Sequence, residues 1–354
     1  MKLRPPRYLV TGATGFLGRH VLAAVERGVP GASVVAPMRR PETWAEMDWT
    51  ADHARVQILQ GGIRDRAWWA GLDDAESGTA GPIDGIFHLA AIVQHSRHGA
   101  EVVYETNIDG TLAMVELAAK LGCRLVFVST SGTVGCSKRA SDSPDEHARY
   151  ATHLVRGWPY YHSKILAEQA ALQRADELGV ELTMLRPPVL LGPGDHRYRS
   201  TGHITRYIRG KMPFRLPGGM HFIDIRDAAD AIVAAMRVES PRPVYHLAGM
   251  ASTLDGFFEI VRDLTGVPMP PRKLPATLAV QLARAADKAA HGLPGKPSNP
   301  LPDPVVVEMA THYWGLSSRY AKDELGYESR DPIVTVRETI DWLSAHHPKL
   351  ARAA

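Results

Sequence analysis

Tyr160 and Lys164 are the two residues of this sequence whose types and spacing best suit acid–base chemistry. They stand four positions apart in a segment that follows Pro159 and reads as a helix, so both side chains can approach the same ligand. A phenol with a pKa of about 10 is a poor acid–base group near neutrality, but a nearby ammonium group favours its ionised form. We therefore expect Lys164 to lower the pKa of Tyr160. Tyr160 could then give a proton to a carbonyl oxygen or take one from an alcohol.

A glycine-rich turn near the N-terminus indicates a bound dinucleotide. Residues 8–11 form a short apolar run, Gly12, Gly15 and Gly18 follow at every third position, and an amphipathic segment comes next. A strand that enters a helix through such a turn directs free backbone N–H groups and the positive end of the helix dipole at one point, which suits a pyrophosphate. Glycines are needed because a Cβ would hold the phosphates away. A nicotinamide cofactor bound there would supply the redox chemistry.

Arg39 and Arg40 follow the second apolar run, where a nucleotide-binding α/β fold meets the adenosine ribose. An acidic residue at this point accepts from both ribose hydroxyls, whereas arginine pairs with a 2′-phosphate. The sequence has no acid here, so we expect NADP(H) to be favoured, with NAD(H) possible. The alternative is that both arginines are simply solvated residues before a proline turn.

Alternating apolar runs and amphipathic segments predict an α/β fold with a Rossmann-like, doubly wound parallel sheet. We expect strands at residues 8–11, 32–38, 56–60, 83–91, 124–129 and 181–186. Residues 1–186 are predicted to form a dinucleotide-binding domain. Residues 187–354 are predicted to form a smaller, mostly helical substrate-binding region, of which about 222–248 return to the core.

Residues 274–290 are predicted to form an amphipathic helix. Its expected apolar face consists of Leu274, Leu278, Leu282, Ala285 and Ala289. This helix could be a substrate lid or domain contact, a subunit contact, or a membrane-surface contact.

The composition is that of an ordinary globular protein, with 354 residues, 45% hydrophobic residues and 22% charged residues. A net charge of +3 without long basic runs gives no reason to expect a nucleic-acid partner. Two cysteines and the lack of any 18-residue apolar stretch favour a cytoplasmic protein without a transmembrane span. The histidines His95, His98, His196 and His203 lack the spacing of a zinc site, and we expect no metal.

Five motifs in order resemble those of the extended short-chain dehydrogenase/reductase family, which includes NAD-dependent epimerases and dehydratases. They are the glycine turn at residues 11–18, the run at 88–91, Asn-x-x-Gly-Thr at 107–111, Tyr-x-x-Ser-Lys-x-x-Ala-Glu at 160–168 and the turn at 186–193. The segments at 202–219 and 222–227 look most like the dihydroflavonol reductase and 3β-hydroxysteroid dehydrogenase branches. The resemblance covers nearly the whole chain and implies a homodimer formed through the helices that hold Asn107 and Lys164.

The resemblance implies a catalytic set of Ser131, Tyr160 and Lys164, with Ser129 and Thr130 as neighbouring hydroxyls that could take the place of Ser131. Lys164 would also hold the nicotinamide ribose. We expect cofactor contacts from Gly12, Thr14, Gly15, Phe16, Leu17, Gly18, Arg39, Arg40, Ile63, Leu89, Ala90, Ala91, Lys164, Pro187 and Val189. We expect substrate contacts from Gln94, His95, Ser131, Leu190, His196 and Tyr198.

These features predict an enzyme that reduces a ketone or aldehyde with NADPH, or oxidises the alcohol. The first alternative is an NAD-dependent nucleotide-sugar epimerase or dehydratase. The absence of tyrosine at Val134-Gly135, where nucleotide-sugar enzymes often keep one, weakens that alternative. The second alternative is a non-catalytic nucleotide-sensing or scaffold protein, which the intact Ser131, Tyr160 and Lys164 disfavour.

Overall fold

The computed structural model describes residues 4–45, 55–73, 81–292 and 302–347. Within them, seven parallel strands form the central sheet in the order β10-β7-β5-β4-β1-β2-β3. These strands are β1 (Arg7–Thr11), β2 (Ser33–Met38), β3 (Val56–Gln60), β4 (Gly85–His88), β5 (Arg124–Val128), β7 (Leu182–Arg186) and β10 (Val244–His246). Their near-continuous apolar sequences fit a parallel sheet that is covered on both faces. The predicted doubly wound α/β fold is confirmed.

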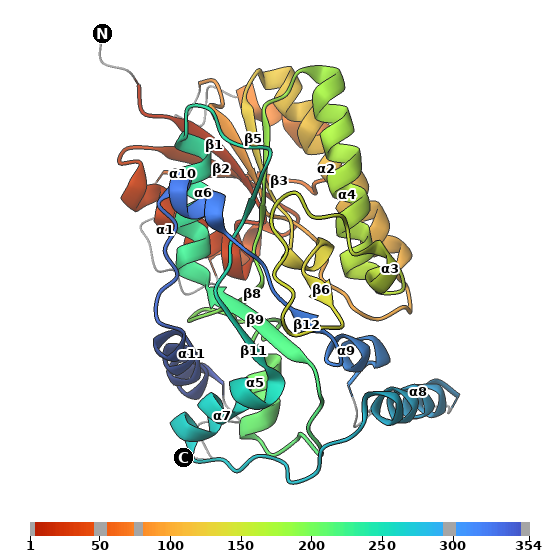
Figure 1. The fold of residues 1–354 in the computed structure, drawn as a ribbon. Coiled ribbons are helices and arrows are strands. Elements are labelled where there is room, and N and C mark those ends of the chain that lie inside the picture. Colours follow the sequence, from red (N-terminus) through yellow and green to blue (C-terminus); the bar gives the residue numbers. More distant parts are fainter. Residues whose placement is uncertain (1–3, 46–54, 74–80, 293–301, 348–354) are drawn as a thin grey trace.

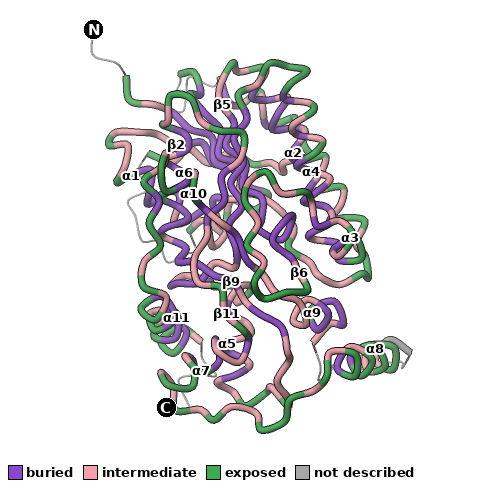
Figure 2. Tube along the Cα trace, viewed as in Figure 1, coloured by how far each residue is buried: buried purple, intermediate pink, exposed green. Residues whose placement is uncertain are grey.

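Helices cover both faces of this sheet (Figure 1). The core on one face includes residues of α1 (Phe16–Gly28), α6 (Ile225–Arg237) and α10 (Arg319–Leu325). The core on the other face includes residues of α2 (Glu101–Leu121) and α4 (Pro159–Leu178). Figure 2 shows the central strands as the most continuously buried part of the chain. The strand order reverses beside β1, which places a ligand crevice at the carboxyl ends of the strands.

The second half of the chain contributes to this core. β10 pairs with β7 in parallel, with Tyr245 opposite Leu185. On α6, the buried Ile232 and Val233 belong to the same apolar core as Val10 and Val21 of the first half. The half of the fold that contains the glycine turn is therefore completed by residues that follow position 186.

A second, three-stranded sheet stands below the first and was not predicted. Its order is β11-β9-β8, formed by β8 (Val189–Leu191), β9 (Gly219–Asp224) and β11 (Met250–Thr253). Around it lie α5 (Gly202–Ile208), α7 (Leu254–Thr265) and α11 (Pro332–His346), whose apolar side chains form a core of their own (Figure 1). The remaining elements are β6 (Cys136–Ser137), β12 (Tyr313–Trp314), α3 (Thr152–Val155), α8 (Ala276–Gly292), α9 (Pro304–Met309) and the 3₁₀ turns η1 (Pro41–Trp44), η2 (Ala67–Asp73) and η4 (Ser131–Thr133).

The predicted packing face of the helix at 274–290 is wrong. Leu278 and Leu282 are 42% and 44% exposed, whereas Ala279 and Ala283 are buried against Val307 of α9. Small alanines let α8 approach α9 closely, so the larger leucines point outward.

Candidate active site

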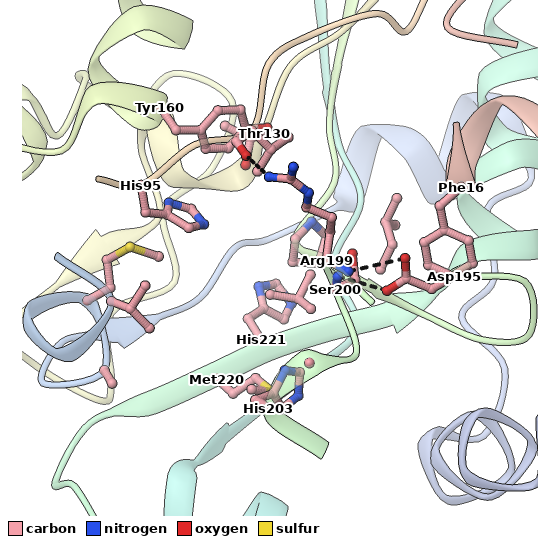
Figure 3. A pocket seen from close by; sticks show the side chains of 18 of the residues that line it. Phe16, His95, Thr130, Tyr160, Asp195, Arg199, Ser200, His203, Met220 and His221 are labelled. Carbon is pink, nitrogen blue, oxygen red and sulfur yellow. Dashed lines mark hydrogen bonds between the residues drawn. The ribbon is translucent and has the colours of Figure 1, made fainter. Parts of the chain in front are cut away.

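A cavity of about 790 Å³ opens at the carboxyl ends of β1, β4 and β5 and extends toward the second sheet. One half is lined by the glycine turn and Arg39, and the other by residues of α5, β9, α7 and α9. Tyr160 and Lys164 also line it (Figure 3). A volume of this size is typical of small-molecule and cofactor sites.

The turn between β1 and α1 is shaped to hold a phosphate group. Gly12 has a φ of +73°, and a Cβ there would lie 2.9 Å from the Ala90 backbone nitrogen. A Cβ on Gly18 would lie 2.1 Å from the Gly12 carbonyl oxygen. Side chains are therefore excluded, and the N-terminus of α1 faces the cavity, so the turn fits a dinucleotide pyrophosphate.

Most residues predicted to contact the cofactor gather around this cavity. Those that line it are Gly12, Thr14, Gly15, Phe16, Leu17, Gly18, Arg39, Leu89, Ala91, Lys164, Pro187 and Val189. Three others, Arg40, Ile63 and Ala90, do not line it. Arg40 is exposed, and the Ile63 side chain lies against Gly110 of α2. Ala90 donates its backbone N–H to the Thr11 hydroxyl behind the turn. The two arginines predicted together are thus separated: both follow β2 and are exposed, but of the two it is Arg39 that lines the cavity.

Lys164 is buried beneath the cavity floor. Its Nζ donates a hydrogen bond of 2.8 Å to the Val128 carbonyl oxygen and lies 4.3 Å from the centre of the Phe127 ring. Burial lowers the pKa of Lys164 to about 7, and the Glu168 carboxylate opposes this shift. Burial thus disfavours the charged form of Lys164, and a hydrogen-bond acceptor on a bound ligand would stabilise that form.

The expectation that the pKa of Tyr160 is lowered is wrong for this structure. Burial raises the pKa of Tyr160 to about 12, and a hydrogen bond with the Thr130 side chain opposes the shift. The neighbouring Lys164 ammonium is directed at the Val128 carbonyl oxygen instead. Tyr160 is therefore a protonated phenol at neutral pH, which suits it to donate a proton.

The three hydroxyls after β5 have different surroundings. Ser129 donates to the buried Glu168 carboxylate, which also accepts a bond of 3.1 Å from Arg186 Nε. Thr130 is the hydrogen-bond partner of Tyr160, and Ser131 begins the 3₁₀ turn η4 and lines the cavity beside them. The Ser129 hydroxyl is thus occupied as a donor to the Glu168 carboxylate of the Glu168–Arg186 ion pair, and Thr130 is the hydroxyl that contacts the phenol.

The predicted substrate residues divide into two groups. His95, Ser131, Leu190 and His196 line the cavity, and the His95 ring meets the Tyr160 ring edge-on at 5.8 Å between centroids. Gln94 and Tyr198 do not line it. The Gln94 amide donates to the His98 carbonyl oxygen at 2.9 Å within its own loop, and the Tyr198 ring packs against Trp342 and His347.

Sequence reasoning missed several residues in the half of the cavity away from the glycine turn. Arg199 directly follows the predicted contact Tyr198, and the others lie later in the chain. Arg199, Met220, His221 and Phe258 line the cavity, as do apolar residues of α9. Burial lowers the pKa values of His95, His203 and His221 to about 4, so these rings are neutral near pH 7. This half of the cavity is therefore lined mainly by apolar side chains and neutral imidazoles, together with the cations Arg197, Arg199, Arg206, Lys211 and Arg215. Of these cations, Arg199 is the one seen beside Tyr160 (Figure 3).

Neither a metal cluster nor a membrane span occurs in the described ranges. There, no group of three histidine, cysteine or acidic side chains is arranged to hold a metal ion. The described helices also include none with the length and apolar character needed to cross a bilayer.

Comparisons with known proteins agree with this geometry. The model of the NAD-dependent epimerase/dehydratase family matches residues 8–248. Sterol demethylase protein B of Methylococcus capsulatus is 28% identical over 281 residues, which cover 79% of this chain and 80% of that protein. Dihydroflavonol 4-reductase of Zea mays is 27% identical over 270 residues, covering 72% and 73%.

A solved structure shows the same fold at low sequence identity. The dTDP-glucose 4,6-dehydratase of Bacillus anthracis, in complex with NAD, has a TM-score of 0.72 at 17% identity, over 99% of this chain and 100% of that one. Together with the family match, the glycine turn and the Tyr160 and Lys164 pair identify the class of protein. The chain belongs to the NAD-dependent epimerase/dehydratase family and is an enzyme of the extended short-chain dehydrogenase/reductase type.

Proposed function

We propose that the chain is an NADP(H)-preferring oxidoreductase that reduces a ketone or aldehyde, or oxidises the corresponding alcohol. The observation that carries the proposal is the gathering of Thr130, Tyr160 and Lys164 in one cavity with the glycine turn. The nicotinamide cofactor, when bound, supplies or accepts the hydride.

Tyr160 is proposed as the general acid in the reduction. With a pKa of about 12 it keeps its proton at neutral pH and can give it to the substrate oxygen as negative charge develops there. The Thr130 hydroxyl orients the phenol, and Ser131 is placed to donate to the same substrate oxygen. Lys164 would bind the nicotinamide ribose, with the glycine turn and Arg39 holding the phosphates.

The substrate is proposed to be bulky and largely apolar. Met220, Phe258 and Met309 line its half of the cavity, and full burial of each such side chain against a ligand adds favourable free energy. The relatives named for a sterol and a dihydroflavonol point to ring systems of this size.

Replacing Tyr160 with phenylalanine tests the catalytic assignment. We expect Tyr160→Phe to lower kcat by about 10²–10⁴-fold while the NADPH dissociation constant stays within twofold of the parent value. Tyr161→Phe is the matched control, because Tyr161 is the adjacent buried phenol and should lose at most a few-fold. Unchanged kcat in Tyr160→Phe would refute the assignment.

The second candidate is an NAD-dependent epimerase or dehydratase. The fold shared with a nucleotide-sugar dehydratase favours this candidate. Such an enzyme retains its cofactor and shows no net oxidation. Denaturing the purified protein and identifying any released nucleotide separates the two. Released NAD, with equal affinity of the emptied protein for NADH and NADPH, would support this candidate and contradict the reductase.

A homodimer and a cytoplasmic location are part of the proposal. α2 and α4 pack side by side on one face of the sheet and would pair with the same helices of a second copy. Light scattering of the purified protein would give twice the monomer mass if this is correct. Cys123 and Cys136 are both free, which fits a reducing compartment.

A further inference from the structure

Arg199 stands on a loop between β8 and α5 that is held in one conformation. The buried Asp195 carboxylate accepts hydrogen bonds from the backbone N–H groups of Arg199, Ser200 and Thr201 at 3.3, 2.9 and 3.0 Å (Figure 3). It also accepts from the Thr201 hydroxyl at 3.0 Å. The loop therefore presents the Arg199 side chain in a fixed direction.

That direction is into the cavity, beside the proposed reacting centre. Arg199 lines the cavity, and its Nη1 donates a bond of 2.8 Å to the Val93 carbonyl oxygen, across from its own loop. Its charge contributes to the lowered pKa of His95, whose ring touches Tyr160. Figure 3 shows the guanidinium directed toward Thr130 and Tyr160.

The guanidinium has no carboxylate partner in the described part of the chain. The acids that line the cavity are Asp195 and Asp255, and both are engaged elsewhere. Asp195 holds the loop, and Asp255 pairs with Arg215 at 3.3 Å and Lys273 at 2.7 Å. Arg199 is exposed to the cavity, which it shares with Arg197, Arg206, Lys211 and Arg215, and most of its five N–H donors are available to a ligand. Such a cation favours an anionic ligand group.

We propose that Arg199 binds a carboxylate of the substrate close to the carbon that reacts. The natural substrate would then be a bulky apolar acid whose hydroxyl or carbonyl lies near its carboxylate. This rests on the proposed function, because it assigns the substrate to the same cavity. The free N–H groups of Arg199 can form a paired contact that a lysine cannot reproduce.

The probe is 3-hydroxy-2-naphthoate, a fluorescent two-ring acid with a hydroxyl beside the carboxylate, together with its methyl ester. Dissociation constants are measured by fluorescence titration at saturating NADP⁺. Parent protein, Arg199→Met, Arg199→Lys and Arg197→Met are compared. Arg197 and Arg199 are both exposed and both line the cavity, two residues apart on one loop, and Arg199 is the one that reaches across to the Val93 carbonyl oxygen. Arg197→Met therefore removes the same charge from the same loop and leaves that contact in place.

We expect the parent protein to bind the acid at least tenfold tighter than the ester. Arg199→Met should bring the two affinities within twofold, Arg199→Lys should lie between, and Arg197→Met should keep the parent ratio. Equal affinities in the parent, an unchanged ratio in Arg199→Met, or an equal loss in Arg197→Met would overturn the proposal. A weaker NADP⁺ affinity in Arg199→Met with an unchanged ratio would mean that Arg199 binds the cofactor, and would also overturn it.

The same protein separates this inference from the proposed function. Failure of NADP⁺ or NADPH to bind, or full activity of Tyr160→Phe on a ketone, would refute the oxidoreductase. Normal ketone turnover with no discrimination between the acid and the ester would refute only the role of Arg199.

Discussion

The indole Nε1 of Trp158 donates a hydrogen bond of 2.9 Å to the Glu308 carboxylate. Trp158 lies two residues before Tyr160, and Glu308 belongs to α9, which lines the substrate half of the cavity. Glu308 also pairs with Arg97, on the loop that carries His95, at 2.6 Å and with Arg284 of α8 at 2.7 Å. One carboxylate of α9 thus joins the start of the Tyr160 helix to the loop that carries His95 and to α8.

Glu308→Gln is expected to destabilise the packing of α9 against the rest of the cavity wall. The variant loses charge-assisted bonds to two arginines, so the free energy of unfolding should fall by about 1–3 kcal/mol and KM should rise. Urea unfolding and steady-state kinetics measure both. Glu105→Gln is the control, because Glu105 pairs with Arg64 on the surface and its loss should change stability by less than about 1 kcal/mol. An unaltered KM in Glu308→Gln would contradict the positioning role.

The contact between Thr130 and Tyr160 predicts which hydroxyl matters most. Thr130→Val keeps the shape but removes the hydrogen bond that opposes the raised pKa of Tyr160. We expect kcat for alcohol oxidation to fall by about 10²-fold and its alkaline rise to move to higher pH. Ser131→Ala, compared in the same pH–rate profiles, should have the smaller effect. A larger loss in Ser131→Ala would restore Ser131 as the principal hydroxyl.

The different placements of Arg39 and Arg40 predict different effects on cofactor choice. Arg39→Ser should weaken NADPH binding by about 10- to 100-fold and leave NADH binding nearly unchanged, because a charge-assisted bond to the 2′-phosphate is lost. Arg40→Ser should change neither affinity, since Arg40 does not line the cavity. Titration of each purified variant with both nucleotides gives the four constants. If Arg39→Ser weakened the binding of NADPH and NADH equally, Arg39 would not be the residue that binds the 2′-phosphate.

Buried neutral histidines predict a loss of stability in mild acid. Burial lowers the pKa of His88 to about 3, whereas the unfolded chain binds the proton near pH 6.5. The unfolded state therefore holds more protons below pH 6.5, and this contribution to stability is present above that pH and falls progressively toward pH 3. His88 alone should cost about 1 kcal/mol between pH 6.5 and 5.5.

Urea unfolding at pH 7.5, 6.5 and 5.5 measures this slope. His88→Gln should give a shallower slope than the parent, because a glutamine does not titrate. His153→Gln is the control, because it removes an exposed imidazole from α3 and leaves the core intact. Equal slopes in all three proteins would mean that His88 does not carry the effect.

The strands of the central sheet could be predicted because each is a local apolar run bounded by polar or glycine residues. The strand predicted at residues 83–91 is longer than β4 (Gly85–His88), because residues 89–91 are apolar but belong to the loop that passes the glycine turn. β11 was missed because only four residues form it, partly exposed, and its partner β9 is about thirty residues earlier. Pairing between distant segments leaves no periodic signal in a single sequence.

The helix that carries Tyr160 and Lys164 and the glycine turn could be predicted from the sequence, because the spacing of their residues is itself the signal. Arg199 and Glu308 could not be predicted in the same way, because Arg199 contacts Val93, 106 residues away, and Glu308 contacts Trp158 and Arg97, 150 and 211 residues away. Leu278 and Leu282 show the same limit. Their periodicity predicts a helix correctly, but which face is buried depends on how closely α9 approaches.

The return of β10 and α6 to the first core has a consequence for how the chain is made. As the ribosome extends the chain, the cofactor-binding half emerges with β7 still unpaired on one side and with the surface that α6 covers exposed to water. This half can reach its final packing only after about residue 246 has left the exit tunnel, so some sixty further residues must be synthesised first. Until then, chaperones have an apolar sheet edge to protect, and a truncation placed at residue 186 would make that exposure permanent.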